Sequence, residues 1–289
     1  MRLAFLGTPQ AAVASLEALV IAGHDVAIVI TRPDRRRGRG PELTPSPVKA
    51  AAQARGLRVA HELSVLDEVQ VEWGVVAAYG AMIPAAVLER TPMLNVHFSL
   101  LPRWRGAAPV ERAILAGDIE TGVGIISLET TLDTGPLHAQ RSTVIEQKTS
   151  GELTRELAQM GSELLVEVLS DPQLLANPRP QEGVSTYAEK LTTESFHLHP
   201  RLSRSEAARV VRLERAFVIV GGRRLRILRA RNSDLRADPG TLGRDGDTIL
   251  LGLSDAAMQL TLVQSEGSRA MDATQWWVGA RLGEDVAWE

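Results

Sequence analysis

The chain has 289 residues, of which 44% are hydrophobic, and this is enough to build the core of one large domain or two moderate ones. It contains no cysteine, so disulfide bonds and thiolate chemistry are excluded. The net charge of −3 indicates no particular partner, and no apolar run reaches the roughly 18 residues that a membrane span needs. The first seven residues are predicted to form a strand rather than a secretion signal. We therefore expect a cytoplasmic protein, and we expect it to be a monomer.

Strands and helices are predicted to alternate up to about residue 170. Apolar runs predict strands at residues 3–6, 26–30, 74–79, 94–97, 122–128 and 137–144. Helical patterns occupy residues 11–22, 47–55, 84–90, 109–116 and 152–169, and three of these helices begin near a proline, which suits a first helical turn. This order predicts an α/β fold over residues 1–171, with a Rossmann-like, doubly wound, mostly parallel sheet and an antiparallel edge at residues 137–144.

The remaining residues have a different pattern. Residues 172–204 begin with an aperiodic stretch that carries three prolines, and they are predicted to be a linker. A short helix through Val211 follows, and then short strands separated by glycine turns at residues 217–220, 224–229, 248–253 and 258–263. Residues 205–289 are therefore predicted to form a small β-barrel domain of the oligonucleotide-binding (OB-like) class.

Arginine is concentrated in two places. Residues 201–236 hold eleven arginines against three acidic residues, a local charge of +8, and residues 32–39 hold five arginines among glycine and proline. Such a loop can reach phosphate groups without being buried. For the second cluster, nucleic-acid binding and a solvated surface are equally good interpretations; for the loop we favour nucleic acid.

Two other motifs are weaker. The turn Gly7-Thr8-Pro9 lacks the glycine pattern of dinucleotide sites, because proline stands where the second glycine would be, so NAD binding is not expected. The six histidines are too scattered for their spacing to predict a metal site. The close pair His197 and His199 is interpreted as two surface residues, and we expect no metal.

The segment LNVHFSLLPRWRGAAP at residues 94–109 is the most informative in the chain. In a strand, Asn95 and His97 project from the same face, and this strand ends where open α/β sheets place their ligands. An amide beside an imidazole suits a developing oxyanion. A strand end with a structurally satisfied histidine is the alternative interpretation.

Asp133 is the candidate third group, because it lies at a loop tip before a glycine-proline turn and can reach the end of a neighbouring strand. A carboxylate near His97 would favour its imidazolium form and help to orient a water for proton transfer. Amide, imidazole and carboxylate without a nucleophilic side chain indicate direct transfer of an acyl group to an amine.

Taken together, residues 94–109 and the Leu132–Gly135 segment LDTG resemble the folate-dependent formyltransferases, in particular the branch that acts on initiator methionyl-tRNA. Further similar segments are GTP at 7–9, TRPD at 31–34, GRG at 38–40, PSPVK at 45–49, AYG at 78–80 and TYAEKL at 186–191. The likeness covers nearly the whole chain.

The resemblance implies a first domain that binds 10-formyltetrahydrofolate, a C-terminal barrel that helps to hold tRNA, and no metal. It implies a catalytic trio of Asn95, His97 and Asp133. Folate contacts would come from Ser99, Leu100, Leu101, Pro102, Met82 and Ile83. Contacts to tRNA would come from Arg36, Arg37, Arg39 and Lys49.

The chain departs from the family pattern at several positions, namely Gln10-Ala11, a short segment before Trp73, residues 213–215 and Phe196–Pro200. Two alternatives to the tRNA enzyme follow. One is a formyltransferase of the same superfamily that acts on an amino sugar or nucleotide sugar, which would not need an arginine loop. The other is a tRNA-binding homologue with weakened catalysis.

Overall fold

A computed structural model describes residues 1–36, 43–283 and 285–289 of the chain. These residues divide into two compact units. Unit 1 consists of Met1–Val110, Glu120–Val144 and Leu153–Glu189, and unit 2 consists of Glu111–Ile119, Ile145–Glu152 and Lys190–Glu289. The predicted linker is shared between them, because its first part up to residue 189 packs with unit 1. None of the helices in the described residues combines the length and the apolar character that a membrane crossing requires.

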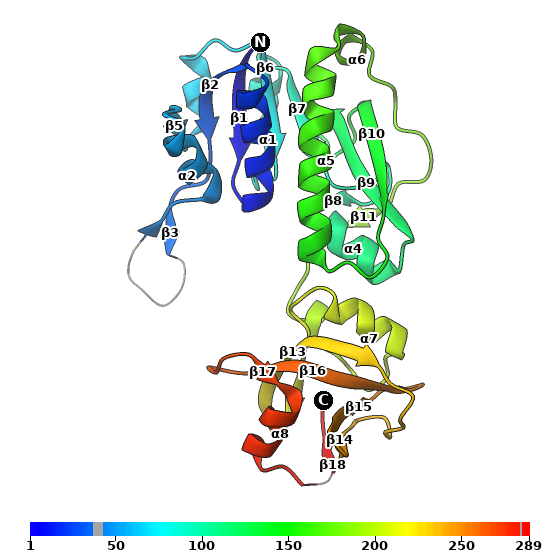
Figure 1. The fold of residues 1–289 in the computed structure, drawn as a ribbon. Helices are drawn as coiled ribbons and strands as arrows, with labels where there is room; N and C mark the ends of the chain where they lie inside the picture. Colours follow the sequence, from blue (N-terminus) through cyan, green and yellow to red (C-terminus); the bar gives the residue numbers. More distant parts are fainter. Residues whose placement is uncertain (37–42, 284) are drawn as a thin grey trace. The chain divides into compact units, whose positions relative to one another are not determined.

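Unit 1 is built on one main sheet (Figure 1). Its strands are β1 (Arg2–Gly7), β2 (Asp25–Ile30), β5 (Val59–Ala60), β6 (Trp73–Ala77), β7 (Met93–His97), β9 (Glu120–Ser127) and β10 (Leu137–Val144). Their spatial order is β10-β9-β7-β6-β1-β2-β5. The strands from β5 to β7 are parallel, whereas β9 runs antiparallel to both β7 and β10. The predicted mostly parallel sheet with an antiparallel edge is confirmed.

Both faces of this sheet are covered, which explains why its central strands are apolar at successive positions. A Cβ placed on Gly7 would lie 2.9 Å from the Cβ of Ala12 in the helix α1, so this face of β1 packs against α1. Ala4 and Leu6 point to the other face and belong to a core with Val65 and Val87. The helices of this unit are α1 (Gln10–Ile21), α2 (Pro47–Ala54), η1 (Leu63–Asp67), α3 (Ala85–Leu88) and α6 (Pro172–Ala176).

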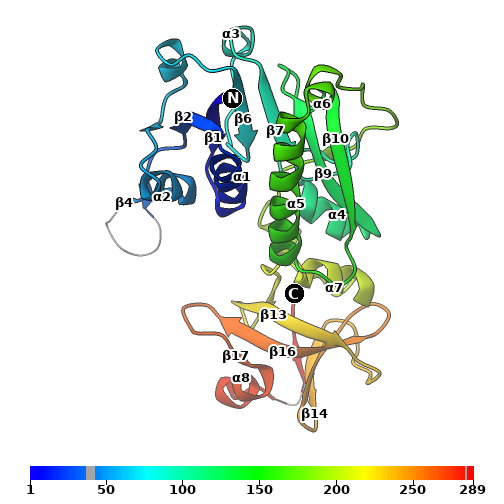
Figure 2. The ribbon, with the colours of Figure 1, turned by 45° about the horizontal axis from the view of Figure 1, so that its top comes forward.

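Two further helices, α4 (Pro109–Ala116) and α5 (Ser150–Ser170), have residues in both units. Within unit 1, α5 lies along β9 and β10, as both views of the ribbon show (Figures 1 and 2). A Cβ on Gly161 would lie 2.8 Å from Val96 and 2.9 Å from Val123, so glycine allows α5 to approach β7 and β9 closely. The start of α2 shows the predicted proline rule, since Pro47 follows Ser46, whose hydroxyl caps the backbone N–H of Lys49.

Unit 2 is an antiparallel barrel with helices packed on it. Its strands are β12 (Phe217–Val220), β13 (Arg223–Asn232), β14 (Thr241–Asp245), β15 (Thr248–Gly252), β16 (Ala257–Ser265), β17 (Met271–Asp272) and β18 (Asp285–Ala287). The main order is β12-β13-β16-β15-β14-β18. The two ends of this order meet, because Val220 and Trp288 form an antiparallel bridge and the N–H of Ile219 donates to the carbonyl of Glu289 at 2.6 Å. The predicted barrel class is confirmed.

The helices of unit 2 are η2 (Glu194–Phe196), α7 (Arg204–Val211) and α8 (Ala273–Ala280). A reciprocal capping box between Ser203 and Glu206 starts α7. The sequence did not lead us to predict α8, which buries Trp276 and Trp277 in the barrel core, or the strands β14 and β18. Short pairs complete the described structure: β3 (Arg35–Arg36) with β4 (Leu43–Thr44), and β8 (Arg105–Gly106) with β11 (Tyr187–Ala188).

Candidate active site

Asn95 and His97 lie at the carboxyl end of β7, in the interior of the sheet. The strand pairs with β6 on one side, where Val96 is opposite Ala77, and with β9 on the other, where His97 is opposite Gly124. Val96 points toward α5, so Asn95 and His97 point to the other face. The imidazole of His97 is buried, with only 7% of its side chain exposed.

Asp133 reaches both side chains from the loop between β9 and β10. Its Oδ1 accepts a hydrogen bond from Nδ2 of Asn95 at 3.3 Å, and its Oδ2 lies 3.6 Å from Nδ1 of His97. The backbone N–H of Gly106 also donates to Oδ2, at 2.8 Å. The structure therefore brings the predicted trio together, and it adds a backbone donor that holds the carboxylate in place.

The two ring nitrogens of His97 have different partners. Nε2 lies 2.9 Å from the carbonyl oxygen of Trp104. Because a carbonyl only accepts, Nε2 must carry a hydrogen in this arrangement. Nδ1 is thereby left as the nitrogen that faces Asp133. Trp104 thus contributes its backbone, and its ring packs under the guanidinium of Arg103 at 4.6 Å.

The loop after β7 is held by a hydrogen bond within the loop and by several bonds to residues 186–188. The buried hydroxyl of Ser99 donates to the carbonyl of Arg103 at 2.6 Å, and the N–H of Trp104 donates to Thr186 Oγ1 at 2.9 Å. Gly106 has a φ of +118°, and a Cβ there would lie 2.8 Å from the carbonyl oxygen of Ala188. Glycine is required at this position because β8 and β11 pair so closely.

Gln181 also supports the site, although the sequence did not lead us to it. Its Nε2 donates to the carbonyls of Asp133 and Gly135, each at 2.8 Å. Its Oε1 accepts from Nε and Nη2 of Arg105 at 3.1 and 2.7 Å. Gln181 lies in the predicted linker, where no local pattern marked it. It joins the loop that carries Asp133 to the loop that follows His97.

The residues expected to contact folate have different surroundings. Leu101 is buried, Leu100 and Pro102 are half-buried, and the hydroxyl of Ser99 is occupied by Arg103 within the loop. After β6, Ile83 is buried in the core, whereas Met82 is 64% exposed. Met82 is thus an apolar side chain that a ligand can contact, and Ile83 packs in the core below the surface.

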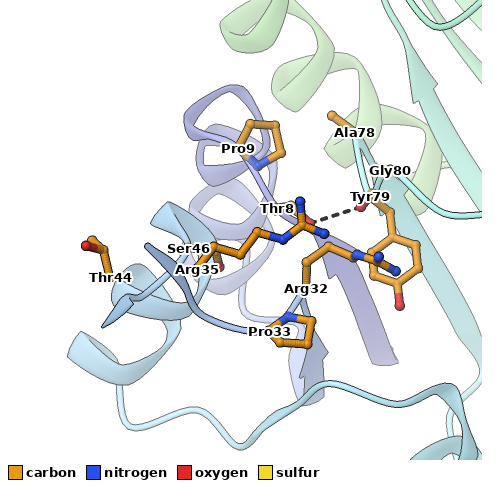
Figure 3. Close-up of a pocket in the computed structure, with 10 residues that line it drawn as sticks. All are labelled: Thr8, Pro9, Arg32, Pro33, Arg35, Thr44, Ser46, Ala78, Tyr79 and Gly80. Atoms are coloured by element: carbon orange, nitrogen blue, oxygen red, sulfur yellow. Dashed lines mark hydrogen bonds between the residues drawn. The ribbon is translucent and has the colours of Figure 1, made fainter. Parts of the chain in front are cut away.

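A cavity of about 350 Å³ opens at the same edge of the sheet, where the turns after β1 and β6 come together (Figure 3). Thr8 Oγ1 donates to the carbonyl of Tyr79 at 3.0 Å and joins these two turns. Arg32 and Arg35 extend across the cavity toward them. Burial raises the pKa of the Tyr79 phenol, and the charge of Arg32 opposes that shift. The lining residues are Thr8, Pro9, Arg32, Pro33, Arg35, Thr44, Ser46, Ala78, Tyr79 and Gly80.

Of the residues expected to contact tRNA, Arg36 is exposed on β3. Lys49 lies in an ion pair with Asp34 at 2.7 Å, so its charge is already partnered within the protein. Arg37 and Arg39 lie outside the described residues. An exposed arginine, Arg36, therefore follows the cavity residue Arg35, and the ion pair of Lys49 holds Asp34, just before the arginine-rich segment.

Two family models match the chain: formyl transferase over residues 1–169, and formyl transferase, C-terminal domain, over residues 205–281. A methionyl-tRNA formyltransferase from Novosphingobium aromaticivorans is 44% identical in an alignment that covers 94% of this chain and 94% of that protein. The chain belongs to the methionyl-tRNA formyltransferase family. The sequence-based prediction of a methionyl-tRNA formyltransferase is thus confirmed.

Solved structures of formyltransferases share the fold. An N-formyltransferase from Helicobacter canadensis, solved with folinic acid and dTDP-3-aminofucose, has a TM-score of 0.69 at 17% identity, covering 91% of this chain and 98% of that one. A methionyl-tRNA formyltransferase from Clostridium thermocellum has a TM-score of 0.54 at 18% identity, covering 81% and 94%. These two structures show the fold, and the family models together with the relative that is 44% identical show that the chain is a formyltransferase.

Proposed function

We propose that the site at the end of β7 transfers the formyl group of 10-formyltetrahydrofolate directly to the α-amino group of initiator methionyl-tRNA. The residue assignment rests on one observation: Asn95, His97 and Asp133 come together at the carboxyl end of β7. None of the three is a hydroxyl or thiol nucleophile. Attack by the substrate's own amine is the acyl-transfer route that such a set supports.

Asn95 and His97 are proposed to stabilise the oxyanion. Attack of a neutral amine on the formyl carbon gives a tetrahedral intermediate with a negatively charged oxygen. Asn95 Nδ2 has two hydrogens, one of which is directed to Asp133, and the other is left for the oxyanion. The imidazole of His97, if protonated at Nδ1, would supply the second donor, since its Nε2 is already hydrogen-bonded to the carbonyl of Trp104. Each well-placed donor contributes about 3 kcal/mol to such a transition state.

Asp133 is proposed to balance the charge on His97 and to position a water that moves the proton from the attacking amine to the leaving folate nitrogen. Its side chain is 9% exposed, which strengthens its interaction with the imidazole relative to a pair in water. The Gly106 N–H and Gln181 fix the carboxylate and its backbone. Asp133 can therefore act without a large rearrangement of its loop.

Folate is proposed to bind along the loop of Ser99, Leu100, Leu101 and Pro102 and against Met82 and Ile83. The exposure of Met82 supports this assignment, because a pterin ring requires apolar surface. Ser99 would shape the loop through Arg103 rather than reach the ligand by its hydroxyl.

The acceptor end of the tRNA is proposed to enter over the cavity of Arg32 and Arg35. Two guanidinium groups at one opening suit phosphate oxygens. Arg36, Arg37 and Arg39 would extend this contact, with Lys49 holding Asp34, and the arginine-rich barrel of unit 2 would add further phosphate contacts. A cytoplasmic location and a monomeric state remain parts of this proposal.

The test is a formylation assay of the full chain with 10-formyltetrahydrofolate and methionyl-tRNA. Asn95→Ala and His97→Ala should each lower kcat by about 10²–10³-fold while circular dichroism shows an intact fold. Asn177→Ala, on an exposed turn after α6, is the matched control and should keep its activity. Near-normal turnover by His97→Ala would overturn the residue assignment, and preferential formylation of an amino sugar would overturn the proposed acceptor.

A further inference from the structure

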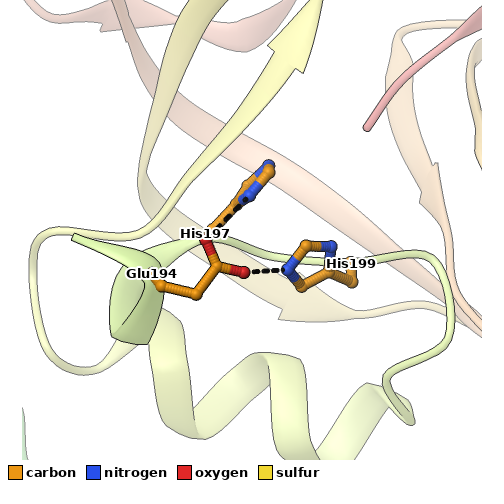
Figure 4. A group of neighbouring side chains, drawn as sticks. All are labelled: Glu194, His197 and His199. Atoms are coloured by element: carbon orange, nitrogen blue, oxygen red, sulfur yellow. Dashed lines mark hydrogen bonds and ion pairs between the residues drawn. The ribbon is translucent and has the colours of Figure 1, made fainter. Parts of the chain in front are cut away.

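Unit 2 contains a group of potential metal ligands that formyl transfer does not use. Glu194, His197 and His199 lie on and just after η2, and their ligand atoms are all within 4.8 Å of one another (Figure 4). Oε1 of Glu194 is 2.7 Å from Nε2 of His199, and Oε2 is 3.8 Å from Nδ1 of His197. The interpretation of the two histidines as surface residues was incomplete, because the side chain of His197 is only 16% exposed.

The ring of His197 is fixed in position. It stacks on Phe217, with ring centroids 4.7 Å apart and planes within 5° of parallel, and the guanidinium of Arg224 lies over the same phenyl ring at 4.0 Å. A parallel β-bridge between His197 and Phe217 sets the backbone. A ligand whose orientation is set before binding loses less conformational entropy when a metal ion arrives.

The hydrogen bonds of His197 also select the nitrogen that faces the group. Nε2 lies 2.9 Å from the backbone oxygen of Glu289. This oxygen accepts, so Nε2 carries the hydrogen, and in the neutral ring the lone pair is on Nδ1, toward Glu194. Histidine ligands of metal ions usually have such an oxygen partner on their second nitrogen, because it fixes the tautomer and raises the basicity of the first.

The other two ligands can adjust to a metal ion. Bonds of about 2.0–2.1 Å from nitrogen and oxygen to a tetrahedral Zn²⁺ place neighbouring ligand atoms about 3.3 Å apart. The ligand atoms now lie within 4.8 Å of one another, and Oε1 of Glu194 faces His199 while Oε2 faces His197. The carboxylate must therefore turn so that one of its oxygens comes to about 3.3 Å from both nitrogens. The side chain of Glu194 is 70% exposed and free of packing that would prevent this movement.

We propose that Glu194, His197 and His199 form a Zn²⁺ site, with Nδ1 of His197, Nε2 of His199, a carboxylate oxygen of Glu194 and water as ligands. Zn²⁺ fits a set of two imidazoles and one carboxylate. Binding requires the Nε2 hydrogen of His199 to leave as a proton. The ion would fix the conformation of residues 194–199, whose His197 already stacks on Phe217 at the start of β12, and it takes no part in formyl transfer.

The experiment uses the full chain after dialysis against EDTA. Titration with Zn²⁺ in a calorimeter should show one saturable site per chain, and Co²⁺ should give visible absorption of a low-coordinate complex. His199→Gln and Glu194→Gln should each weaken Zn²⁺ binding at least about tenfold. His61→Gln, in unit 1, removes a histidine that bonds to the carbonyl of Thr31, and it should bind Zn²⁺ as the unaltered chain does.

Thermal unfolding provides a second measurement. Excess Zn²⁺ should raise the unfolding temperature of the unaltered chain and of His61→Gln but not of Glu194→Gln, because ligand binding to the native state adds stability. Formylation of methionyl-tRNA by Glu194→Gln should be unchanged, which separates this proposal from the catalytic one. Failure to detect saturable Zn²⁺ binding, or equal affinity of His199→Gln and the unaltered chain, would overturn the site and show an ion pair only.

Discussion

The carboxylate of Asp133 accepts a hydrogen bond of 2.8 Å from the backbone N–H of Gly106. Asp133 lies in the loop after β9 and Gly106 lies in β8, the short strand that follows β7, and the bond fixes the carboxylate beside His97. Asp133 itself has a φ of +53°, a left-handed conformation that aspartate and asparagine adopt more readily than other residues with a Cβ. The position of the acid thus depends on backbone geometry at both residues.

Asp133→Asn isolates the charge of this residue, because asparagine accepts the same backbone conformation and can still accept the Gly106 hydrogen bond. We expect kcat to fall by about 10²-fold, because the variant lacks the carboxylate that is proposed to balance the charge on His97 and to position the proton-transferring water. The KM for folate should change little. Steady-state kinetics with urea unfolding as the stability control provide the measurement; activity within twofold of the unaltered enzyme would mean that the charge is not used.

Gly106→Ala should disturb both the backbone and the site. Alanine at a φ of +118° is strained, and its Cβ would approach the Ala188 oxygen at 2.8 Å. Gly183→Ala is the matched control, since Gly183 has a φ of +107° but its nearest neighbour, Pro102, is 3.8 Å away. In urea unfolding we expect Gly106→Ala to cost at least about 1 kcal/mol more than the control. An equal loss in the free energy of unfolding for the two variants would show that β8 and β11 can move apart to accommodate the added Cβ.

His138 should make stability depend on pH. Burial lowers the pKa of this imidazole below 6.5, so the folded state prefers the neutral ring, which bonds to Ser127 and to the carbonyl of Leu174. Its contribution is fully present above pH 6.5, the ordinary value of the unfolded chain, and is lost as the pH falls from there through the lowered pKa of the folded state, because the unfolded chain binds the proton more readily. The free energy of unfolding, measured between pH 5 and 8, should fall less steeply with acid in His138→Gln. A residual slope is expected from His24, whose pKa is also lowered by burial, but an unaltered slope would contradict the prediction.

Removing arginine charge at the cavity, or from the arginine-rich segment that follows Arg36 in the sequence, should weaken tRNA binding and leave folate binding unchanged. In Arg35→Gln, and in Arg37→Ala combined with Arg39→Ala, we expect a higher KM for methionyl-tRNA and a shallower salt dependence. Each lost phosphate contact lowers the slope of log affinity against log salt by about 0.7–0.9. Binding assays from low to moderate salt supply the measurement. A slope identical to that of the unaltered enzyme would mean that these arginines are only solvated.

The sequence predicted the architecture where local pattern and tertiary environment agree. The strands β1, β2, β6 and β7 are continuous apolar runs because both faces are covered, and Pro47 and Pro109 mark helix starts. The helix α8 was missed because its adjacent Trp276 and Trp277 both enter the barrel core, and such a pair does not produce the spacing of an amphipathic helix. The strand β14 contains Gly243 and is too short to give a clear alternation.

For the candidate site too, residues with a local sequence pattern were predictable, and residues positioned by distant contacts were not. Asn95 and His97 were predictable because two polar residues interrupt a buried strand at its end, and the structure places Asp133 beside them. Gln181 could not be predicted, since its partners Asp133 and Arg105 lie at least 48 residues away and its own segment has no periodicity. Glu194 was missed for a related reason: histidine spacing alone does not show which carboxylate a short 3₁₀ turn will bring to the pair.

The contacts of Gln181 set the smallest fragment that can keep the active centre. A chain cut at residue 171 would retain Asn95, His97 and Asp133, yet it would lose the amide that ties the Asp133 and Gly135 carbonyls and the β11 strand that pairs with Arg105–Gly106. Asp133 would then lie in a loop that has lost its hydrogen bonds to Gln181. Excised domains or fusions built from this enzyme must therefore carry the chain through Glu189, well beyond the last residue of the main sheet.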